Sequence, residues 1–214
     1  MSVAPPPPPS RPSPARQRLS PDVRVRQILD AALAEFSARG YAATRVDDIA
    51  RRAGLSKGGF YAHFESKERV FEALLTRMLA PPALDADTVL GGCADCRALA
   101  GRIVDLLFER LSRPETLATL RLLVAEGERV PHLVALWYGN TVESLSVHLG
   151  EVLERAVGRG LCRPGVAVER PWLVLAPVVH VTMARLVFAG LPVPSLRNSR
   201  DDCVDALCEL LAPR

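Results

Sequence analysis

Aromatic residues and strand-forming stretches are scarce in this chain of 214 residues. Phenylalanine, tryptophan and tyrosine together make up 5% of the sequence. Alanine, leucine, glutamate and arginine are plentiful, and these residues favour helices. No segment alternates between apolar and polar residues in the way that a half-buried strand does. Because 49% of the residues are apolar, the chain has ample material for a core. The composition therefore predicts an all-α fold.

Several chemical signatures are also missing. The first residues, Met-Ser-Val-Ala and five prolines, contain no apolar run of a secretory signal. Five cysteines are an odd number, which does not suggest the disulfide framework of a secreted domain, so we expect a cytoplasmic protein. The sequence has no G-x-S-x-G motif, no nucleotide-binding loop and no paired metal ligands. We therefore expect neither an enzyme nor a metal or cofactor site.

The charge is unevenly distributed along the chain. Its formal net value is only +3, but residues 1–80 hold 13 Lys+Arg against 8 Asp+Glu, whereas the remainder holds 14 against 16. A basic excess confined to one part of a chain is typical of a surface that binds nucleic acid.

The segment from Thr44 to Lys67 reads as two short helices joined by a tight turn. Thr44 is a good N-cap, and Asp47 three residues later completes a capping box. Gly54 can end the first helix in a left-handed conformation. Ser56 can then cap a second helix that runs to about residue 64. Helix, glycine-containing turn and helix form the pattern of a helix-turn-helix, whose second helix enters the DNA major groove.

The second helix has side chains suited to DNA. Lys57 stands in its first turn, where a recognition helix meets base edges. Gly58 and Gly59 are poor helix formers, but they let the backbone come close to a base or phosphate. Three further residues offer hydrogen-bond donors to phosphate oxygens, and these are Tyr61, His63 and Lys67. The structural alternatives are a half-buried core tyrosine and an ordinary surface histidine. Two other pairs of residues, Arg51 and Arg52 with Asp47 and Asp48, are expected to form ion pairs at i,i+4.

The sequence GLSKGGFYAHFESKE resembles the recognition-helix signature of the tetracycline-repressor (TetR) family of transcriptional regulators, and the resemblance extends over about residues 23–79. It implies base contacts from the first turn of the second helix and phosphate contacts around it. Gly59 departs from the family, which often has a larger residue there. The expected DNA-contacting set is Thr44, Arg45, Ser56, Lys57, Gly58, Gly59, Tyr61, His63 and Lys67.

The remaining helices divide the chain into three parts. Residues 1–19, with seven prolines and Arg11, Arg16 and Arg18, read as a disordered tail that is either inert or an arm reaching DNA. A DNA-binding domain is expected over 20–66, with its first helix starting at Ser20-Pro21 and ending at Gly40. Residues 67–214 are expected to form a helical ligand-binding and dimerisation domain, with helices over 66–80, 95–111, 114–126, 131–157, 168–189 and 199–211, and a loop over 80–95.

The helix over 168–189 is apolar almost all round. A transmembrane segment is the competing interpretation, but Pro177, His180 and Arg185 count against it. A buried helix at a subunit interface is the other interpretation, and the resemblance implies that the last two long helices pair in a homodimer. Such a dimer would present two recognition helices to a palindromic double-stranded operator, about 34–36 Å apart. The expected interface residues are Leu175, Val179, Leu186, Val204, Leu207 and Leu211.

By the same resemblance, a pocket for a small-molecule effector lies among the C-terminal helices. A kink at Pro177 would open space for it. The apolar candidates indicate a hydrophobic or aromatic effector. The candidate lining residues are Phe108, Trp137, Tyr138, His148, Trp172, His180 and Met183.

Cys93-Ala-Asp-Cys96 leaves an alternative open. A zinc site would need two more ligands, and a thioredoxin-like site would need a βαβ context. Two interpretations of these cysteines remain: they have no special role, or they form a thiol redox sensor. The sequence thus predicts a repressor released from DNA by a small hydrophobic ligand, with a thiol-sensing regulator as the alternative.

Overall fold

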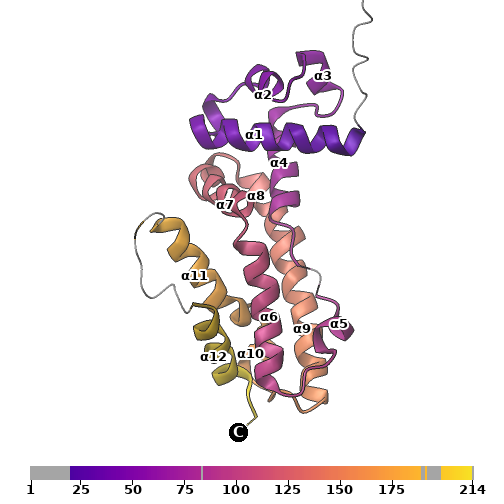
Figure 1. Ribbon diagram of the computed structural model, residues 1–214, viewed down its shortest axis with the longest axis vertical. Helices are drawn as coiled ribbons and strands as arrows, with labels where there is room; N and C mark the ends of the chain where they lie inside the picture. Colours follow the sequence, from indigo (N-terminus) through magenta and orange to yellow (C-terminus); the bar gives the residue numbers. More distant parts are fainter. Residues whose placement is uncertain (1–19, 83, 189–190, 192–198, 214) are drawn as a thin grey trace, which may run out of the picture.

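The computed structural model describes residues 20–82, 84–188, 191 and 199–213. Within these ranges the chain is helical and contains no strand, which confirms the all-α fold (Figure 1). None of the described helices is long and apolar enough to cross a membrane. The predicted tail over 1–19, with its three arginines, lies outside the described residues.

The first four helices form one end of the molecule. They are α1 (Pro21–Ala43), α2 (Val46–Arg52), α3 (Lys57–Tyr61) and α4 (Lys67–Met78). Figure 1 shows α1 lying crosswise beneath α2 and α3, while α4 runs from this end into the body of the protein. Helix α3 is therefore held on the outermost surface, and α4 connects this end directly to the rest of the protein.

Glycine and serine residues set the bounds of these helices as the sequence predicts. Ser20 and Ser66 cap α1 and α4, because their hydroxyls accept hydrogen bonds from Val23 N and Arg69 N at 3.4 and 3.2 Å. Gly40 breaks the regular helix with φ +78°, although the chain continues for a few helical residues to Ala43. A residue with a Cβ rarely adopts this conformation.

The core of this end crosses the predicted domain boundary. Phe36, Tyr41 and Phe71 pack together with ring centroids 5.1 to 5.9 Å apart. The same apolar cluster, here called the N-terminal cluster, also takes buried side chains from the C-terminal part, namely Leu122, Leu123, Val130 and Leu133. The first four helices are thus packed as one unit with part of the following helices.

The C-terminal part is a bundle around the long helices α6 and α9 (Figure 1). Its elements are α5 (Ala86–Leu90), α6 (Cys96–Leu111), α7 (Pro114–Glu126), the 3₁₀ turn η1 (Gly127–Arg129), α8 (Pro131–Trp137), the π-helical segment η2 (Tyr138–Glu143), α9 (Ser144–Gly158), α10 (Val166–Glu169), the 3₁₀ turn η3 (Pro171–Leu175), α11 (Ala176–Val187) and α12 (Ser199–Leu211).

Three sequence predictions need correction here. The loop over 80–95 contains the short helix α5, which Asp85 caps by accepting a hydrogen bond from Thr88 N at 2.8 Å. The helix over 131–157 has a π-helical segment in its middle. The helix over 168–189 is divided into α10, η3 and α11, and Pro177 lies in the first turn of α11. Proline is tolerated there, so it does not kink a helix interior.

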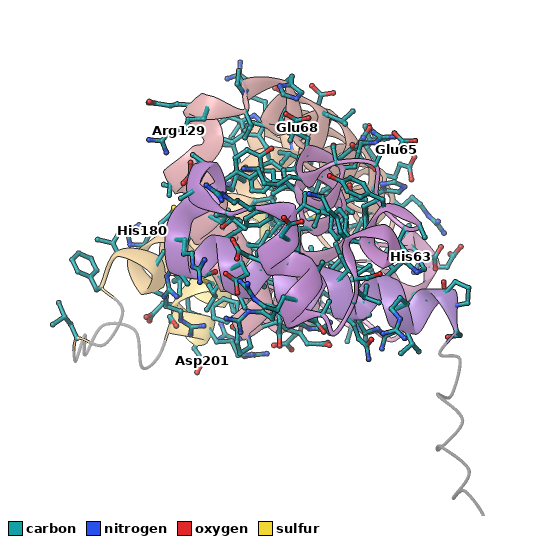
Figure 2. All side chains as sticks on the ribbon, turned by 90° about the horizontal axis from the view of Figure 1, so that it is seen from above. His63, Glu65, Glu68, Arg129, His180 and Asp201 are labelled. Carbon is teal, nitrogen blue, oxygen red and sulfur yellow. The ribbon has the colours of Figure 1, made fainter. Side chains whose placement is uncertain are left out.

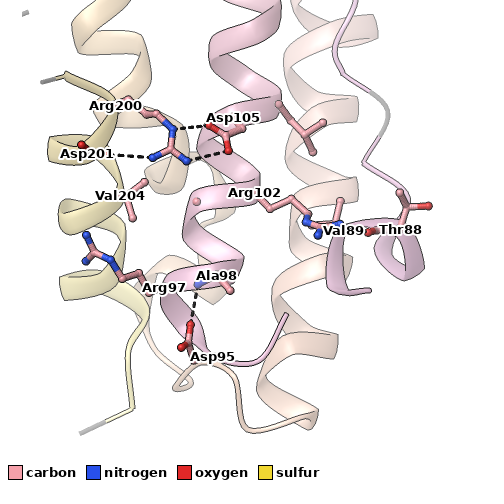
Figure 3. Close-up of a pocket in the computed structure, with 12 residues that line it drawn as sticks. Thr88, Val89, Asp95, Arg97, Ala98, Arg102, Asp105, Arg200, Asp201 and Val204 are labelled. Carbon is pink, nitrogen blue, oxygen red and sulfur yellow. Dashed lines mark hydrogen bonds and ion pairs between the residues drawn. The ribbon is translucent and has the colours of Figure 1, made fainter. Parts of the chain in front are cut away.

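Helix α12 packs against α6 as part of the protomer's own core. Val204, Leu207 and Leu211 are at most 3% exposed and lie in one apolar cluster with α6 and α9. The prediction that these three residues face a partner subunit is therefore wrong. Arg200 of α12 also links the two helices, because its guanidinium donates to the Asp105 carboxylate of α6 at 2.6 and 2.9 Å (Figure 3).

Candidate DNA-binding surface and effector cavity

Helix α3 presents most of the predicted DNA-contacting residues to solvent. Ser56 caps it by accepting a hydrogen bond from Gly59 N at 3.1 Å, and the completely buried Phe60 anchors its inner face. The helix ends at Tyr61, three residues earlier than expected. The residues exposed on or beside it are Ser56, Lys57, Gly58, Tyr61 and His63, and His63 lies at the edge of this end when it is viewed from above (Figure 2).

The two adjacent glycines of α3 have different surroundings. A Cβ added to Gly58 would meet no atom within 4 Å, so this position faces open space. A Cβ added to Gly59 would lie 3.4 Å from side-chain atoms of Leu55 and Ser56. The backbone at Gly58 is therefore the one that a DNA base could approach most closely.

Thr44 is buried instead of capping α2. It is 2% exposed, and its hydroxyl lies 2.8 Å from the carbonyl oxygen of Gly40 and 3.2 Å from that of Glu35. The N-cap is Arg45, whose N–H donates to the Asp48 carboxylate at 3.4 Å. The prediction that Thr44 caps the helix is wrong, and its burial does not suit a phosphate contact either. Arg45 is exposed and remains a candidate for that contact.

The charged residues of α2 are paired differently from the i,i+4 prediction. Arg51 pairs with Asp48 at i,i+3, whereas Arg52 reaches the buried Glu35 of α1 at 2.7 Å. Asp47 instead lies 3.1 Å from the ammonium of Lys57. That pair is exposed on both sides, so it contributes little stability, and Lys57 can exchange Asp47 for DNA at small cost.

Lys67 supports the end of α1 and the residue that follows it. Its ammonium donates to the carbonyl oxygens of Tyr41 and Thr44 at 2.7 and 3.0 Å and lies 4.4 Å from the centre of the Tyr41 ring. Burial lowers the pKa of Lys67, and it raises the pKa of Tyr41 to about 12. Lys67 therefore has a structural role in this fold, and an additional phosphate contact stays a prediction.

A carboxylate of the C-terminal part, that of Glu126, contacts the same end of α1. Glu126, at the end of α7, is 6% exposed and accepts a hydrogen bond from Tyr41 N at 3.1 Å. Its second oxygen lies 2.6 Å from Arg129. The end of α1 is thus hydrogen-bonded directly to α7.

An apolar cavity of about 410 Å³ lies where α4 ends among the C-terminal helices. Its size is within the usual range for small-molecule sites. The segment that directly follows α4 contributes Leu79, Ala80, Pro81 and Pro82 to the wall. Further lining residues come from α6, α7, α8, the π-helical segment, α9, η3 and α11, and they include Leu107, Arg110, Thr116, Leu120, Thr141, Leu145, Leu175, Val178 and Thr182.

Three of the seven predicted effector-contacting residues line this cavity, namely Trp137, Tyr138 and Met183. The other four do not. His148, Trp172 and His180 are exposed on the outside, and Phe108 packs against Arg185. Val179 and Leu175, which were expected at the dimer interface, also line the cavity. Arg110 and the prolines after α4 had no periodic signal in the sequence, because only the tertiary contact between Arg110 of α6 and the end of α4 brings these segments together.

Most polar groups in the cavity wall have partners within the chain. The hydroxyl of Thr116 donates to Met78 O at 3.1 Å, and that of Thr182 donates to Val178 O at 2.8 Å. Arg110 donates to Arg77 O and Ala80 O at 2.6 and 2.8 Å, which fixes the end of α4. The cavity therefore suits a predominantly apolar molecule.

A second, more open hollow lies between α5, α6 and α12 (Figure 3). Its charged groups are already paired. Arg97 pairs with Asp205 at 2.7 Å, and Arg102 donates to Thr88 O at 3.0 Å. Together with the Arg200–Asp105 pair, these contacts hold helices together, so this hollow has the features of a structural contact.

Cys96 does not have the environment of an activated thiol. All five are free, and burial next to Cys208 and Cys162 raises the pKa of Cys96 to about 11. The Cys93 thiol donates to Val89 O at 3.3 Å. A reactive thiol needs a lowered pKa, so Cys96 is poorly suited to redox sensing. The described residues also contain no cluster of three or more His, Cys, Asp or Glu that could hold a metal ion.

Comparisons with known proteins agree with this architecture. Residues 28–74 match the family model of bacterial regulatory proteins of the tetR family, and residues 101–165 match the C-terminal domain of AefR-like transcriptional repressors. The chain belongs to the TetR family of transcriptional regulators. The family model over 28–74 covers α2 and α3, which confirms the resemblance seen in the recognition helix.

Individual relatives extend the TetR-family similarity over most of the chain. It is 29% identical to the transcriptional repressor KstR2 of Rhodococcus jostii, over 80% of this chain and 84% of the relative. It is also 29% identical to the regulator SrpR of Pseudomonas putida, over 68% of this chain and 67% of that one. A TetR-family structure from Mesorhizobium loti has the same fold, with a TM-score of 0.70 at 22% identity, covering 92% of this chain and all of the other.

Proposed function

We propose that the protein is a homodimeric repressor that binds a palindromic operator through α3 and is released by a hydrophobic small molecule bound in the apolar cavity. Helix α4 is the observation that carries this proposal. It begins at Lys67, beside the helix-turn-helix, and the residues that directly follow it, Leu79 to Pro82, form part of the cavity wall. A molecule that fills the cavity would therefore contact the segment that continues α4, the helix that leads to the helix-turn-helix.

The DNA contacts are proposed from exposure and charge. Lys57 and the backbone at Gly58 are exposed and are proposed to meet base edges, while the exposed Arg45, Tyr61 and His63 are proposed to donate to phosphates. Release requires that the effector prefers a conformation whose helix spacing does not fit the operator. A ligand with equal affinity for both conformations would not change the equilibrium between them.

The dimer is proposed to form through the exposed apolar face of α11 and its flanks. Val179 and Met183 are 45% and 38% exposed there, and Val187 is 72% exposed. Large apolar side chains grouped on one surface mark an interaction site. Since Val179 and Met183 also line the cavity, a partner seated on this face would cover the cavity's rim.

Selection of genomic DNA fragments by the purified protein tests the proposal. Wild type is expected to enrich a palindromic site, and the double variant Lys57→Ala with Tyr61→Ala is expected to lose the enrichment while keeping its helical content by circular dichroism. Equal enrichment by both proteins would show that α3 does not read the operator.

A further inference from the structure

The C-terminal end of α4 is joined to the bundle by hydrogen bonds from two side chains of the cavity wall. The guanidinium of Arg110 on α6 donates to the carbonyl oxygens of Arg77 and Ala80 at 2.6 and 2.8 Å. The hydroxyl of Thr116 on α7 donates to the carbonyl oxygen of Met78 at 3.1 Å. The last carbonyl groups of a helix have no donor within the helix, so Arg110 and Thr116, here called the α4 clamp, supply donors from outside. Both residues line the cavity.

The position of Arg110 and the position of the end of α4 depend on each other. Burial, and to a smaller extent the nearby charge of Arg113, lowers the pKa of Arg110. A cation is favoured at the C-terminal end of a helix, where the helix dipole is negative. Moving the guanidinium away from Arg77 O and Ala80 O would leave a partly buried charge without these acceptors, which is unfavourable.

The segment between α4 and the rest of the cavity wall is stiff. Ala80 accepts a hydrogen bond from the clamp and also lines the cavity, together with Pro81 and Pro82. Proline fixes its own φ and restricts the residue before it. A displacement of this part of the wall is therefore passed on to the end of α4 and to the clamp.

The opposite end of α4 is fixed to the DNA-binding end, which α1, α2 and α3 form with it. Lys67, the first residue of α4, donates to Tyr41 O and Thr44 O at 2.7 and 3.0 Å. Phe71, one turn further on, is completely buried in the N-terminal cluster. The 12 residues of α4 form a helix about 18 Å long. A change in position at its clamped end therefore changes the position of the helix-turn-helix.

We propose that the α4 clamp transmits the state of the cavity to the helix-turn-helix, with Arg110 as the main positioning residue. This inference rests on the proposed function and names the side chains that couple its two sites. DNA binding requires the clamped position of α4. An apolar molecule that displaces the wall at Ala80 separates this residue from Arg110, and it shifts the population because it prefers the unclamped arrangement.

Variants of Arg110 test the clamp through the affinity for DNA. Arg110→Met keeps most of the apolar stem and removes both hydrogen bonds, whereas Arg110→Lys keeps the charge. Arg102→Met is the matched control, because Arg102 also lies on α6 and donates to a carbonyl oxygen, that of Thr88 at 3.0 Å, but lies outside the cavity wall. The probe is the duplex that wild type selects from genomic DNA, and circular dichroism at the assay temperature establishes that each variant is folded.

Arg110→Met is expected to weaken binding to this duplex about 3- to 10-fold, which corresponds to about a third to a tenth of the molecules keeping α4 in the binding-competent position. Arg110→Lys should recover part of the loss, and Arg102→Met should leave the affinity unchanged. If Arg110→Met lowers the urea midpoint but binds the duplex like wild type, the clamp only stabilises the fold and the inference is overturned, while the proposed function stands. If wild type selects no palindromic duplex, the proposed function fails and the inference with it.

A cavity-filling variant connects the clamp to the cavity without an effector. Val142 in the π-helical segment is partly buried and lines the cavity, and Val142→Trp adds a large apolar side chain at this position. It is expected to weaken the selected duplex about 3- to 10-fold when Arg110 is present, but to add little to Arg110→Met, because the clamp is already open in that variant. Additive losses would overturn the assignment of Arg110 as the coupling residue. No loss in either background would remove the link between cavity and DNA on which the proposed function depends.

Discussion

Replacement of Glu126 tests how the C-terminal part is joined to the DNA-binding end. In Glu126→Ala, the N–H of Tyr41 loses an acceptor in a buried site. Leaving a buried donor unpaired costs about 1–3 kcal/mol. Loss of the ion pair with Arg129, whose side chain is 64% exposed, adds no more than about 1 kcal/mol. The variant is therefore expected to lose about 1–4 kcal/mol of its free energy of unfolding.

Glu126→Gln is the matched control. Its amide oxygen can still accept from Tyr41 N, so only the ion pair is lost and the change should stay within about 1 kcal/mol. Urea unfolding, followed by circular dichroism at fixed protein concentration, measures both variants. If the glutamine variant is as unstable as the alanine variant, or if the alanine variant is as stable as wild type, the hydrogen bond to Tyr41 does not hold this junction.

Three further predictions concern stability. Gly40→Ala should lower the free energy of unfolding by about 1–3 kcal/mol, because φ is +78° there and the new Cβ would lie 2.9 Å from a Glu126 oxygen; urea unfolding would contradict this if the midpoint were unchanged. Lys67→Met should lower stability by about 1.5–3 kcal/mol through loss of its charged hydrogen bonds, and an unaltered thermal midpoint would exclude that role. The Arg200 guanidinium lowers the pKa of Asp105, so this carboxylate stabilises the fold above its unfolded-state pKa and the contribution disappears as the pH falls through the folded-state pKa. Asp105→Asn should therefore flatten the acid side of the stability–pH curve, and a curve parallel to that of wild type would argue against the pairing.

The helices that carry strong local signals could be predicted from the sequence. Ser20, Ser56 and Ser66 are caps in the structure, and Gly40 interrupts the first helix as expected. These features depend on residues within one turn of each other, so the sequence alone contains them. The apolar repeats of α6 and α7 likewise gave correct bounds.

Features that depend on tertiary packing could not be predicted in the same way. Thr44 has the chemistry of a cap, but its hydroxyl is drawn inward to two carbonyl oxygens of α1. The apolar stripe of α12 looked like a subunit interface because a sequence does not tell whether an apolar face meets its own chain or a partner. The cavity combines residues from seven helical elements and the segment after α4, so the sequence predicted only Trp137, Tyr138 and Met183 among them as effector contacts.

The affinity of the protein for its selected operator and for a scrambled duplex, measured over a range of salt concentrations, tests the central claim most directly. Lys57→Ala should reduce the ratio of the two affinities, because it removes a base contact. Arg45→Ala should weaken both duplexes alike and reduce the salt slope by about 0.9, the value of one phosphate contact. Equal losses on both duplexes with Lys57→Ala, or an unchanged ratio and slope in both variants, would contradict the assignment of α3 as the element that reads DNA.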